Sequence, residues 1–313
     1  KNKKESYMNS ILATSIEFAN LGIKLNNVGK SISIFGVDIA YYGMIIATGM
    51  ILGIIVTCAE AKRTGQDPND YIDFAIYAII FSVIGARLYY VIFSWDYYKK
   101  NPGQILNIRG GGLAIYGGII AAIITCFVYT RIKKMSMPRV MDTAVLGLIL
   151  GQILGRWGNF FNREAFGGVA SGKNPFAMKI YFDSHYSITQ VPDSVREGME
   201  KMFGKTLEQI GYIQVHPTFL YESCWNLVLL IILLIFRDKK KYNGEVFLWY
   251  IIGYGIGRFF IEGLRSDQLI MPVTGWPVSQ VLSLILVIVG IAFAIYMRNK
   301  LKKDVDDTSE IEI

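Results

Sequence analysis

The chain has 313 residues, of which 52% are hydrophobic and only 18% are charged. Average soluble domains carry about 25% charged residues, so this composition excludes an ordinary soluble domain and a disordered chain, and three cysteines exclude a disulfide scaffold. The net charge of +7 does not indicate nucleic-acid binding, because the basic residues form short clusters between apolar runs, the pattern that sets membrane topology.

Apolar segments recur along the chain at close to the length of about 20 residues that a helix needs to cross a bilayer core. They predict an all-α polytopic membrane protein with seven transmembrane helices, at residues 37–59, 71–95, 111–130, 140–155, 218–236, 245–261 and 278–297. The fourth and sixth segments are short and end in charged sequence, so we expect their ends to lie at functional depth.

Basic clusters set the expected orientation, because cytoplasmic flanks are enriched in Lys and Arg. Such clusters follow the first, third, fifth and seventh segments, whereas the loop after the second segment holds only three cations. We therefore expect the N-terminus outside and the C-terminus in the cytoplasm. The clusters are Lys62 and Arg63; Arg131, Lys133, Lys134 and Arg139; Arg237, Lys239, Lys240 and Lys241; and Arg298, Lys300, Lys302 and Lys303.

The expected domain organisation follows these segments. It comprises an extracytoplasmic N-terminal arm (1–36), spans one to four (37–156), a small extracytoplasmic head (157–215), spans five to seven (216–300) and a cytoplasmic tail (301–313). The arm contains no continuous apolar stretch of signal-peptide type. Residues 179–182 alternate between polar and apolar, which predicts a short strand in the head.

Charged residues at membrane depth are costly and are functional candidates by default. The first cluster closes the fourth span with Arg156, Asn159 and Asn162, followed by Glu164 and Gly167. A spacing of three lets one helical turn or a tight loop aim the first three side chains together. Arg offers a fork of donors that suits phosphate, and glycine lets backbone approach a ligand. The alternative is an arginine that snorkels at a helix end.

The second cluster lies at the end of the sixth span. Arg258, Glu262 and Arg265 fall at i, i+4 and i+7 on one helix face, so Glu262 can brace both arginines. Two cations with one anion leave a positive face that suits an anionic ligand. The alternative is an ion-pair ladder that only satisfies buried charge.

The third cluster, at the start of the fifth span, holds His216, Tyr221 and Glu222. Histidine can move protons near neutral pH; the alternative is a helix-capping histidine with an interfacial tyrosine. The fourth cluster opens the third span with Arg109, three glycines and Tyr116. Exposed N–H groups at a helix start bind anions, and the alternative is small-residue packing between membrane helices.

Arg87 in the second segment and Tyr42 in the first are weaker candidates of the same kind. All four clusters belong to the predicted outer half of the membrane. Their cationic forks, neutral donors and glycines fit an anionic phospholipid headgroup in the outer leaflet.

At these residues the sequence resembles the bacterial prolipoprotein diacylglyceryl transferase family over nearly its whole length. The most specific block is GRWGNFFNREAFG at 155–167, followed by HPTFLYE at 216–222 and by YGIGRFFIEGLR, which begins at Tyr254. Weaker support comes from GARLYYV at 85–91 and from Tyr42 with Gly43. The chain departs from the family at Tyr116, where family members commonly have a histidine that is proposed as the base. A tyrosine pKa near 10 makes a poor base, so Tyr116 has a hydrogen-bonding role or the base lies elsewhere.

The resemblance implies transfer of the diacylglyceryl group of phosphatidylglycerol to the lipobox Cys thiol of a preprolipoprotein signal peptide, with release of glycerol phosphate. It implies a site in the bacterial plasma (inner) membrane that faces the outer leaflet. The expected catalytic residues are Arg156 and Arg258 on the phosphate and Tyr116 or His216 for the proton or the thiol. The expected substrate-binding residues are Tyr42, Arg87, Asn159, Asn162, Glu164, Gly167, Tyr221, Glu222, Tyr254, Glu262 and Arg265.

No sequence motif for a metal, a nucleotide or an acyl-enzyme is present, so we expect no cofactor. Cys58, Cys126 and Cys224 lie in apolar spans and are interpreted as packing residues. An anion transporter, the main rival, predicts polar residues that reach both faces of the membrane. A lipid-binding scaffold predicts phosphatidylglycerol binding without transfer, and an intramembrane protease lacks an evident Ser–His pair or paired aspartates.

Overall fold

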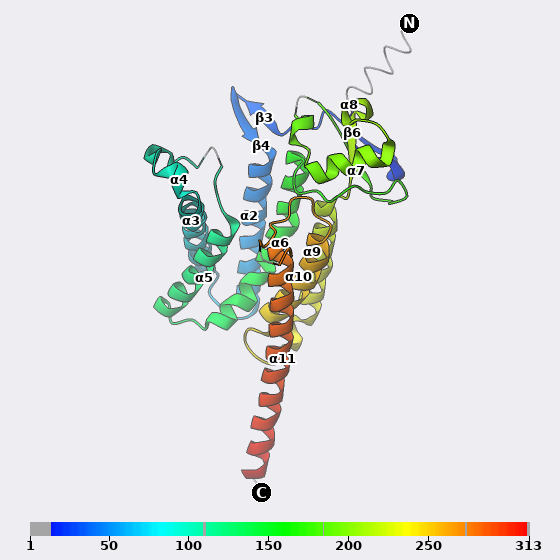
Figure 1. The fold of residues 1–313 in the computed structure, drawn as a ribbon. Helices are drawn as coiled ribbons and strands as arrows, with labels where there is room; N and C mark the ends of the chain where they lie inside the picture. Colours follow the sequence, from blue (N-terminus) through cyan, green and yellow to red (C-terminus); the bar gives the residue numbers. More distant parts are fainter. Residues whose placement is uncertain (1–13, 109–110, 184, 273, 312–313) are drawn as a thin grey trace. The chain divides into compact units, whose positions relative to one another are not determined.

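The computed structural model describes residues 14–108, 111–183, 185–272 and 274–311, and most of them are helical (Figure 1). Within these ranges six helices are long and apolar enough to cross a membrane. The chain is therefore a mostly helical multi-pass membrane protein. It divides into a first unit, Lys1–Ile51 with Ile149–Lys239 and Leu248–Ile313, and a second unit, Leu52–Leu148 with Lys240–Phe247.

The six candidate spans match six of the seven predicted segments, with shifted ends. They are α2 (Tyr41–Arg63), α3 (Pro68–Phe93), α5 (Ile115–Ile132), α6 (Met137–Asn162), α9 (Thr218–Phe236) and α11 (Val278–Ile311). The remaining predicted segment, the sixth, forms α10 (Glu245–Glu262). Its length of 18 residues is sufficient, but it contains the charged residues Glu245, Arg258 and Glu262 and is not among the six.

Two helix boundaries differ from the prediction for local reasons. Helix α2 begins at Tyr41 and not at residue 37, because β4 (Val37–Ala40) pairs with β3 (Ser31–Ile34) in a hairpin. Phe35 and Gly36 form its turn with φ of 51° and 78°, the positive angles that a two-residue hairpin loop requires. Helix α6 continues to Asn162, well beyond the predicted end at residue 155, so the polar residues 156–162 lie on a helix.

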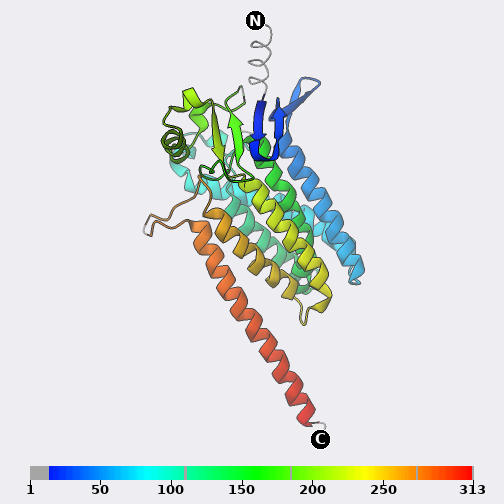
Figure 2. The same ribbon diagram turned by 90° about the vertical axis from the view of Figure 1, so that its right-hand side faces the viewer.

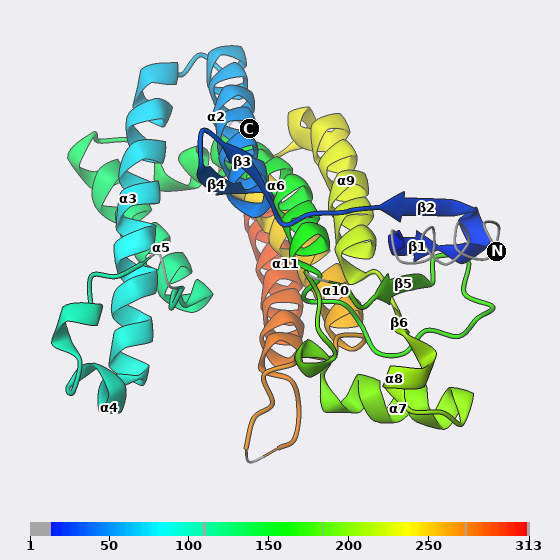
Figure 3. The same cartoon turned by 90° about the horizontal axis from the view of Figure 1, so that it is seen from above.

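A four-stranded sheet corrects the all-α prediction. Its order is β2-β1-β5-β6, and all its neighbouring strands are antiparallel (Figure 3). The predicted strand at residues 179–182 appears as β5 (Met178–Tyr181), shifted by one residue. The other strands and the covering helices are β1 (Thr14–Phe18), β2 (Ile23–Asn26), β6 (Tyr212–Val215), α7 (Asp193–Phe203) and α8 (Leu207–Ile210).

The first two strands of this sheet come from the segment that was predicted as a separate arm. Ile16 pairs with Ile180 of β5, and both side chains are fully buried in one core with Val195 and Met199 of α7. We call this sheet with its helices the head. The described part of the predicted arm and residues 178–215 therefore share a single hydrophobic core.

The helices of the first unit begin or end at the head. Figures 1 and 2 show α9 starting beside the sheet and α11 continuing far beyond the last turn of α9. Helix α9 contacts α6 through the Ser223 hydroxyl, which donates to the Ile153 carbonyl at 3.1 Å. It contacts α10 through the Trp225 indole, which donates to the Gly253 carbonyl at 2.9 Å.

In the second unit, glycines let membrane helices approach closely, as small residues do in bilayers. Helices α3 and α5 lie side by side (Figures 1 and 3). A Cβ on Gly85 of α3 would lie 2.7 Å from the Gly117 carbonyl oxygen of α5. The short helix α4 (Trp95–Tyr98) follows α3. The close approach of Gly117 to Gly85 supports the alternative that the glycine cluster serves helix packing.

Candidate functional site

Two arginines from distant parts of the sequence meet at one buried carboxylate. Arg156 lies near the end of α6, Arg258 lies in the last turns of α10, and Glu222 lies in the second turn of α9. The Arg156 guanidinium reaches Glu222 Oε1 at 2.5 Å, and the Arg258 guanidinium reaches Glu222 Oε2 at 3.1 Å. The Glu222 side chain is 3% exposed, whereas the Arg156 side chain keeps 21% exposure.

A second carboxylate extends this network along α10 and into the next loop. Glu262 Oε2 lies 2.6 Å from Arg258 and 3.7 Å from Arg265. Arg265 also binds Asp267 through two hydrogen bonds, at 2.9 and 2.7 Å. We call Arg156, Glu222, Arg258, Glu262 and Arg265 the charge cluster. Glu262 braces both arginines as the helical spacing predicts, and the cluster itself has one more cation than anions.

Tyr254 joins the cluster from one turn before Arg258. Its hydroxyl donates to Glu222 Oε1 at 3.4 Å and also interacts with Arg156. Each buried charge of the cluster therefore has an opposite charge or a hydrogen-bond partner, which is the condition for keeping ions at low dielectric.

The two asparagines of the predicted cluster bind a different carboxylate. Asn159 and Asn162 both donate to Glu164 Oε1, at 3.2 and 3.1 Å. Glu164 is exposed and lies in a tight turn after α6, where Arg163 and Ala165 both have φ of 54°. This left-handed conformation costs non-glycine residues roughly 1–2 kcal/mol. Such strain often marks a functional site, and here it presents Glu164 beside the two amides.

Tyr42 lies against the same stretch of α6. A Cβ on Gly158 would be 2.6 Å from the Tyr42 ring, so the glycine makes room for the aromatic side chain. The phenol interacts electrostatically with both Glu164 and Arg156. Tyr42 therefore stands between the amide–carboxylate turn and the charge cluster.

Gly167 lies where three chain segments pack closely against one another. Its N–H donates to the His216 carbonyl at 2.9 Å, and a Cβ would lie 2.8 Å from both His216 Cβ and the Leu264 carbonyl oxygen. The neighbouring Gly168 N–H donates to the same Leu264 carbonyl at 2.8 Å. The close packing alone requires a glycine at this position, and the predicted approach of Gly167 to a ligand stays a prediction.

His216 forms a small polar group with Asn174 and Tyr221. Its Nδ1 lies 3.1 Å from the Asn174 amide nitrogen and 3.3 Å from the Tyr221 hydroxyl. The amide nitrogen of Asn174 can only donate, so Nδ1 is the acceptor and the neutral ring carries its proton on Nε2. Burial lowers the pKa of His216 below its ordinary value. The imidazole is therefore neutral at pH 7, and its basic nitrogen is already occupied.

Arg87 has its contacts within the second unit. Its guanidinium donates to the carbonyls of Gln104, Ile105, Gly111 and Gly112, at 2.6 to 2.9 Å. The side chain is buried and holds the loop before α5. These bonds give Arg87 a structural role, and its predicted contact with the substrate stays a prediction. Tyr116 lies in the first turn of α5, also in the second unit, and Arg109 lies outside the described residues.

Two roles escaped the sequence prediction. Glu222 was predicted only as a substrate contact, although it is the carboxylate that joins the two arginines. Asn174 was not singled out, yet it contacts both His216 and Tyr221. A carboxylate in an otherwise apolar helix is a usable signal for Glu222, because such a charge requires a partner. No local pattern marks Asn174.

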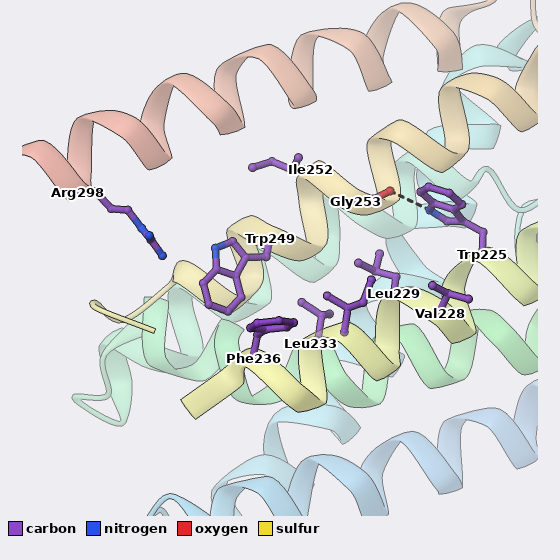
Figure 4. A pocket seen from close by; sticks show the side chains of 10 residues that line it. Trp225, Val228, Leu229, Leu233, Phe236, Trp249, Ile252, Gly253 and Arg298 are labelled. Atoms are coloured by element: carbon purple, nitrogen blue, oxygen red, sulfur yellow. Dashed lines mark hydrogen bonds between the residues drawn. The ribbon is translucent and has the colours of Figure 1, made fainter. Parts of the chain in front are cut away.

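An apolar pocket of about 470 Å³ is lined mainly by residues of α9 and α10 (Figure 4). It runs along α9 and α10, and the hydrogen bond from Trp225 to Gly253 marks one end. The Trp225 ring also contacts Gly257, the residue before Arg258. The lining residues are Trp225, Val228, Leu229, Ile232, Leu233, Phe236, Trp249, Ile252, Gly253 and Arg298.

Comparison with known proteins places this arrangement in a family. The model of the family described as "Prolipoprotein diacylglyceryl transferase" matches residues 30–296. Among curated proteins, the phosphatidylglycerol–prolipoprotein diacylglyceryl transferase of Clostridioides difficile is 43% identical over 276 residues, covering 88% of this chain and 97% of that protein. The same enzymes of Finegoldia magna and Lysinibacillus sphaericus are 41% and 43% identical over 87% and 85% of this chain and over 97% and 90% of their own lengths. The chain therefore belongs to the prolipoprotein diacylglyceryl transferase family and is a diacylglyceryl transferase.

Proposed function

We propose that the charge cluster binds the phosphate of phosphatidylglycerol and stabilises it as it leaves. The observation that carries this proposal is the shared carboxylate: Arg156 and Arg258 both contact Glu222, at 2.5 and 3.1 Å. Glu222 holds the two guanidinium groups side by side, and Arg156 stays partly exposed. A planar fork of N–H donors matches phosphate oxygens in a way that no other side chain does.

The transfer breaks one bond and forms another. The thiolate of the lipobox Cys attacks the glycerol carbon that carries the phosphate, a C–S bond forms, and the C–O bond to phosphate breaks. The products are a diacylglyceryl thioether and glycerol phosphate, and the thiol proton is lost. Negative charge grows on the departing phosphate, where preorganised donors have their largest effect. The same cations lower the pKa of a nearby thiol and favour the thiolate.

Glu164 is proposed to bind the glycerol hydroxyls of the headgroup. Its Oε1 is held by the amides of Asn159 and Asn162, and an ionised carboxylate only accepts hydrogen bonds. Hydroxyl groups of a glycerol headgroup are suitable donors. Tyr42 is close enough to interact with both Glu164 and Arg156, so one ligand that contacts all three is consistent with these positions.

The proton acceptor is assigned to neither predicted candidate. His216 Nδ1 already accepts from Asn174, which favours a positioning role for His216 and Tyr221. Tyr116 remains a predicted hydrogen-bond donor to the substrate. A thiol pKa lowered toward neutrality by the arginines reduces the need for a strong base.

We infer that α10 also crosses the membrane, which gives seven spans. Its 18 residues extend about 27 Å at 1.5 Å per residue, close to the thickness of a bilayer core of about 30 Å. With seven spans the basic clusters all lie in the cytoplasm, and the head lies outside. The charge cluster is at the head end of α6, α9 and α10, so it faces the outer leaflet of the bacterial plasma membrane.

The apolar pocket is proposed to hold one acyl chain of the transferred group. From Trp225 to Phe236, α9 advances 11 residues, or about 16 Å. That length is about half of a bilayer core of about 30 Å, the depth of one leaflet. An acyl chain in this pocket leaves the glycerol carbons beside Arg258.

The test combines the purified chain, phosphatidylglycerol vesicles and a peptide with a lipobox cysteine. Mass spectrometry is expected to show a peptide that carries a diacylglyceryl group, together with free glycerol phosphate. A peptide with serine in place of the cysteine is the control and should remain unmodified. Two results would overturn the proposal: binding of phosphatidylglycerol without a diacylglyceryl peptide, or anion flux across the vesicle membrane without such a peptide.

A further inference from the structure

A second polar layer lies in the first unit, one helical turn further from the head than the charge cluster. Gln152 precedes Arg156 by four residues on α6, Asn226 follows Glu222 by four on α9, and Tyr254 precedes Arg258 by four on α10. Residues four apart lie on the same helix face. Tyr250 lies one turn before Tyr254. We call Gln152, Asn226, Tyr250 and Tyr254 the amide–phenol layer.

Contacts within this layer lead to Glu222. The Gln152 amide donates to the Tyr250 hydroxyl at 2.8 Å. The Tyr250 and Tyr254 rings stack with centroids 5.6 Å apart, and the Tyr254 hydroxyl donates to Glu222. Tyr250 also interacts electrostatically with Glu222. A chain of contacts, two hydrogen bonds and one aromatic stack, therefore runs from α6 through α10 to the carboxylate that joins the two arginines.

Three atoms of the layer are buried without a hydrogen-bond partner among the described residues. They are Oε1 of Gln152 and both the Nδ2 and the Oδ1 of Asn226. Asn226 is fully buried and shares the inward stripe of α9 with Glu222 and Ser223. Unpaired buried amides are costly, and a buried water that makes about three hydrogen bonds is the usual remedy.

We propose that the amide–phenol layer, completed by enclosed water at Asn226 and Gln152, is a positioning device for Glu222. It fixes the carboxylate so that Arg156 and Arg258 are held at the spacing of one phosphate. This inference rests on the proposed role of the charge cluster. The layer itself does not touch the phosphate; it acts through Glu222.

Activity should then fall by more than any loss of stability explains. Asn226→Leu replaces an amide that has no protein partner among the described residues by an apolar side chain of similar size, so thermal stability is expected to stay the same or rise. Transfer to the lipobox peptide is expected to fall about tenfold, because the loss of one hydrogen bond in a charged network has an effect of this order. Tyr250→Phe removes the acceptor of the Gln152 amide, so its stability is expected to fall, but its transfer rate should fall by more than that loss of stability explains.

Val195→Ala is the control for stability. Val195 is fully buried in the core of the head, so its truncation lowers stability and lies outside the amide–phenol layer, the charge cluster and the apolar pocket. If Asn226→Leu and Tyr250→Phe lose activity only in proportion to stability, as Val195→Ala does, the layer is merely structural and the proposal fails. Unchanged turnover in both variants would also overturn it.

A double-mutant comparison separates this inference from the proposed function. The background variant is Glu222→Gln, or Glu222→Asp if the first does not fold. In it, Tyr250→Phe should cause little further loss of transfer activity, because the carboxylate through which Tyr250 acts has already been changed. An equal further loss contradicts action through Glu222. If Glu222→Gln alone keeps wild-type turnover, the proposed role of the charge cluster fails. If the Glu222→Gln variant transfers slowly but the Tyr250→Phe variant transfers at the wild-type rate, only the inference about the amide–phenol layer fails.

Discussion

Arg156 makes the single-residue chemistry of the site testable, because the shape of its guanidinium matters as well as its charge. Lysine keeps the charge but offers a compact ammonium in place of a planar fork. We expect Arg156→Lys to lower the turnover number by about 10²-fold, the usual effect of losing one preorganised donor. Product formation measured by mass spectrometry gives the rate. Arg196→Lys is the control, since Arg196 lies in the head and donates to the Ile188 carbonyl at 3.1 Å.

His216 links folding of the head to pH. Its pKa is lowered by burial, so the unfolded chain binds a proton at higher pH than the folded chain does. The stability that comes from keeping the ring neutral is complete above about pH 6.5, the ordinary histidine value, and is lost as the pH falls below it. Between pH 7 and pH 5, melting temperature should fall more steeply in the wild type than in His216→Gln. Parallel curves would contradict this expectation.

Gly167 tests how the elements around the site are joined. Its Cβ position lies 2.8 Å from two neighbouring atoms, on His216 and Leu264, so Gly167→Ala forces the loop, the end of β6 and the segment after α10 apart. Overpacking of this kind costs about 1–3 kcal/mol, and thermal unfolding should show a clear loss. Gly172→Ala is the matched control, because its nearest neighbour would be 4.0 Å away. Equal melting temperatures for both variants would disprove the packing role.

The pocket between α9 and α10 predicts a dependence on chain length. Val228→Trp fills the pocket from α9, so we expect slower transfer from long-chain phosphatidylglycerol and little change with a short-chain lipid. Ile231→Trp is the control, since Ile231 is exposed on α9 but does not line the pocket. A loss that is the same for both lipids would argue against an acyl chain at this position.

Hydropathy predicted the helices well and their ends less well. Helix α9 begins and ends as predicted at Thr218 and Phe236, where apolar sequence and helix coincide. At residues 37–40 hydropathy misled, because the apolar run pairs as a strand. The pairing of Arg156 with Glu222 joins residues 66 positions apart, and no periodicity within one helix contains that information. Motifs identified the residues of the site, but only the packing of helices shows which carboxylate holds which arginine.

At the scale of the whole molecule, the predicted orientation is open to direct labelling. In a chain whose Cys58, Cys126 and Cys224 are replaced by alanine, Lys173→Cys places a thiol in the exposed part of the head, and Lys239→Cys places one in a basic cluster. A membrane-impermeant thiol reagent should modify the first variant in cells with an intact plasma membrane. It should modify the second only after that membrane is permeabilised. The reverse result would invert the topology.

The order of strands in the sheet means that β1 cannot pair with β5 until much of the chain has been synthesised. Strand β1 lies between β2 and β5, and Ile16 finds its partner at Ile180. At a translation rate of about 5–20 residues per second, the 164 residues between them take roughly 8–33 s to emerge. During that interval the four apolar helices α2, α3, α5 and α6 are synthesised. The edge of β1 that later pairs with β5 is unpaired until then. An exposed strand edge can pair with another chain. The nascent chain is therefore most prone to misfolding before α6 has entered the bilayer and β5 has been synthesised.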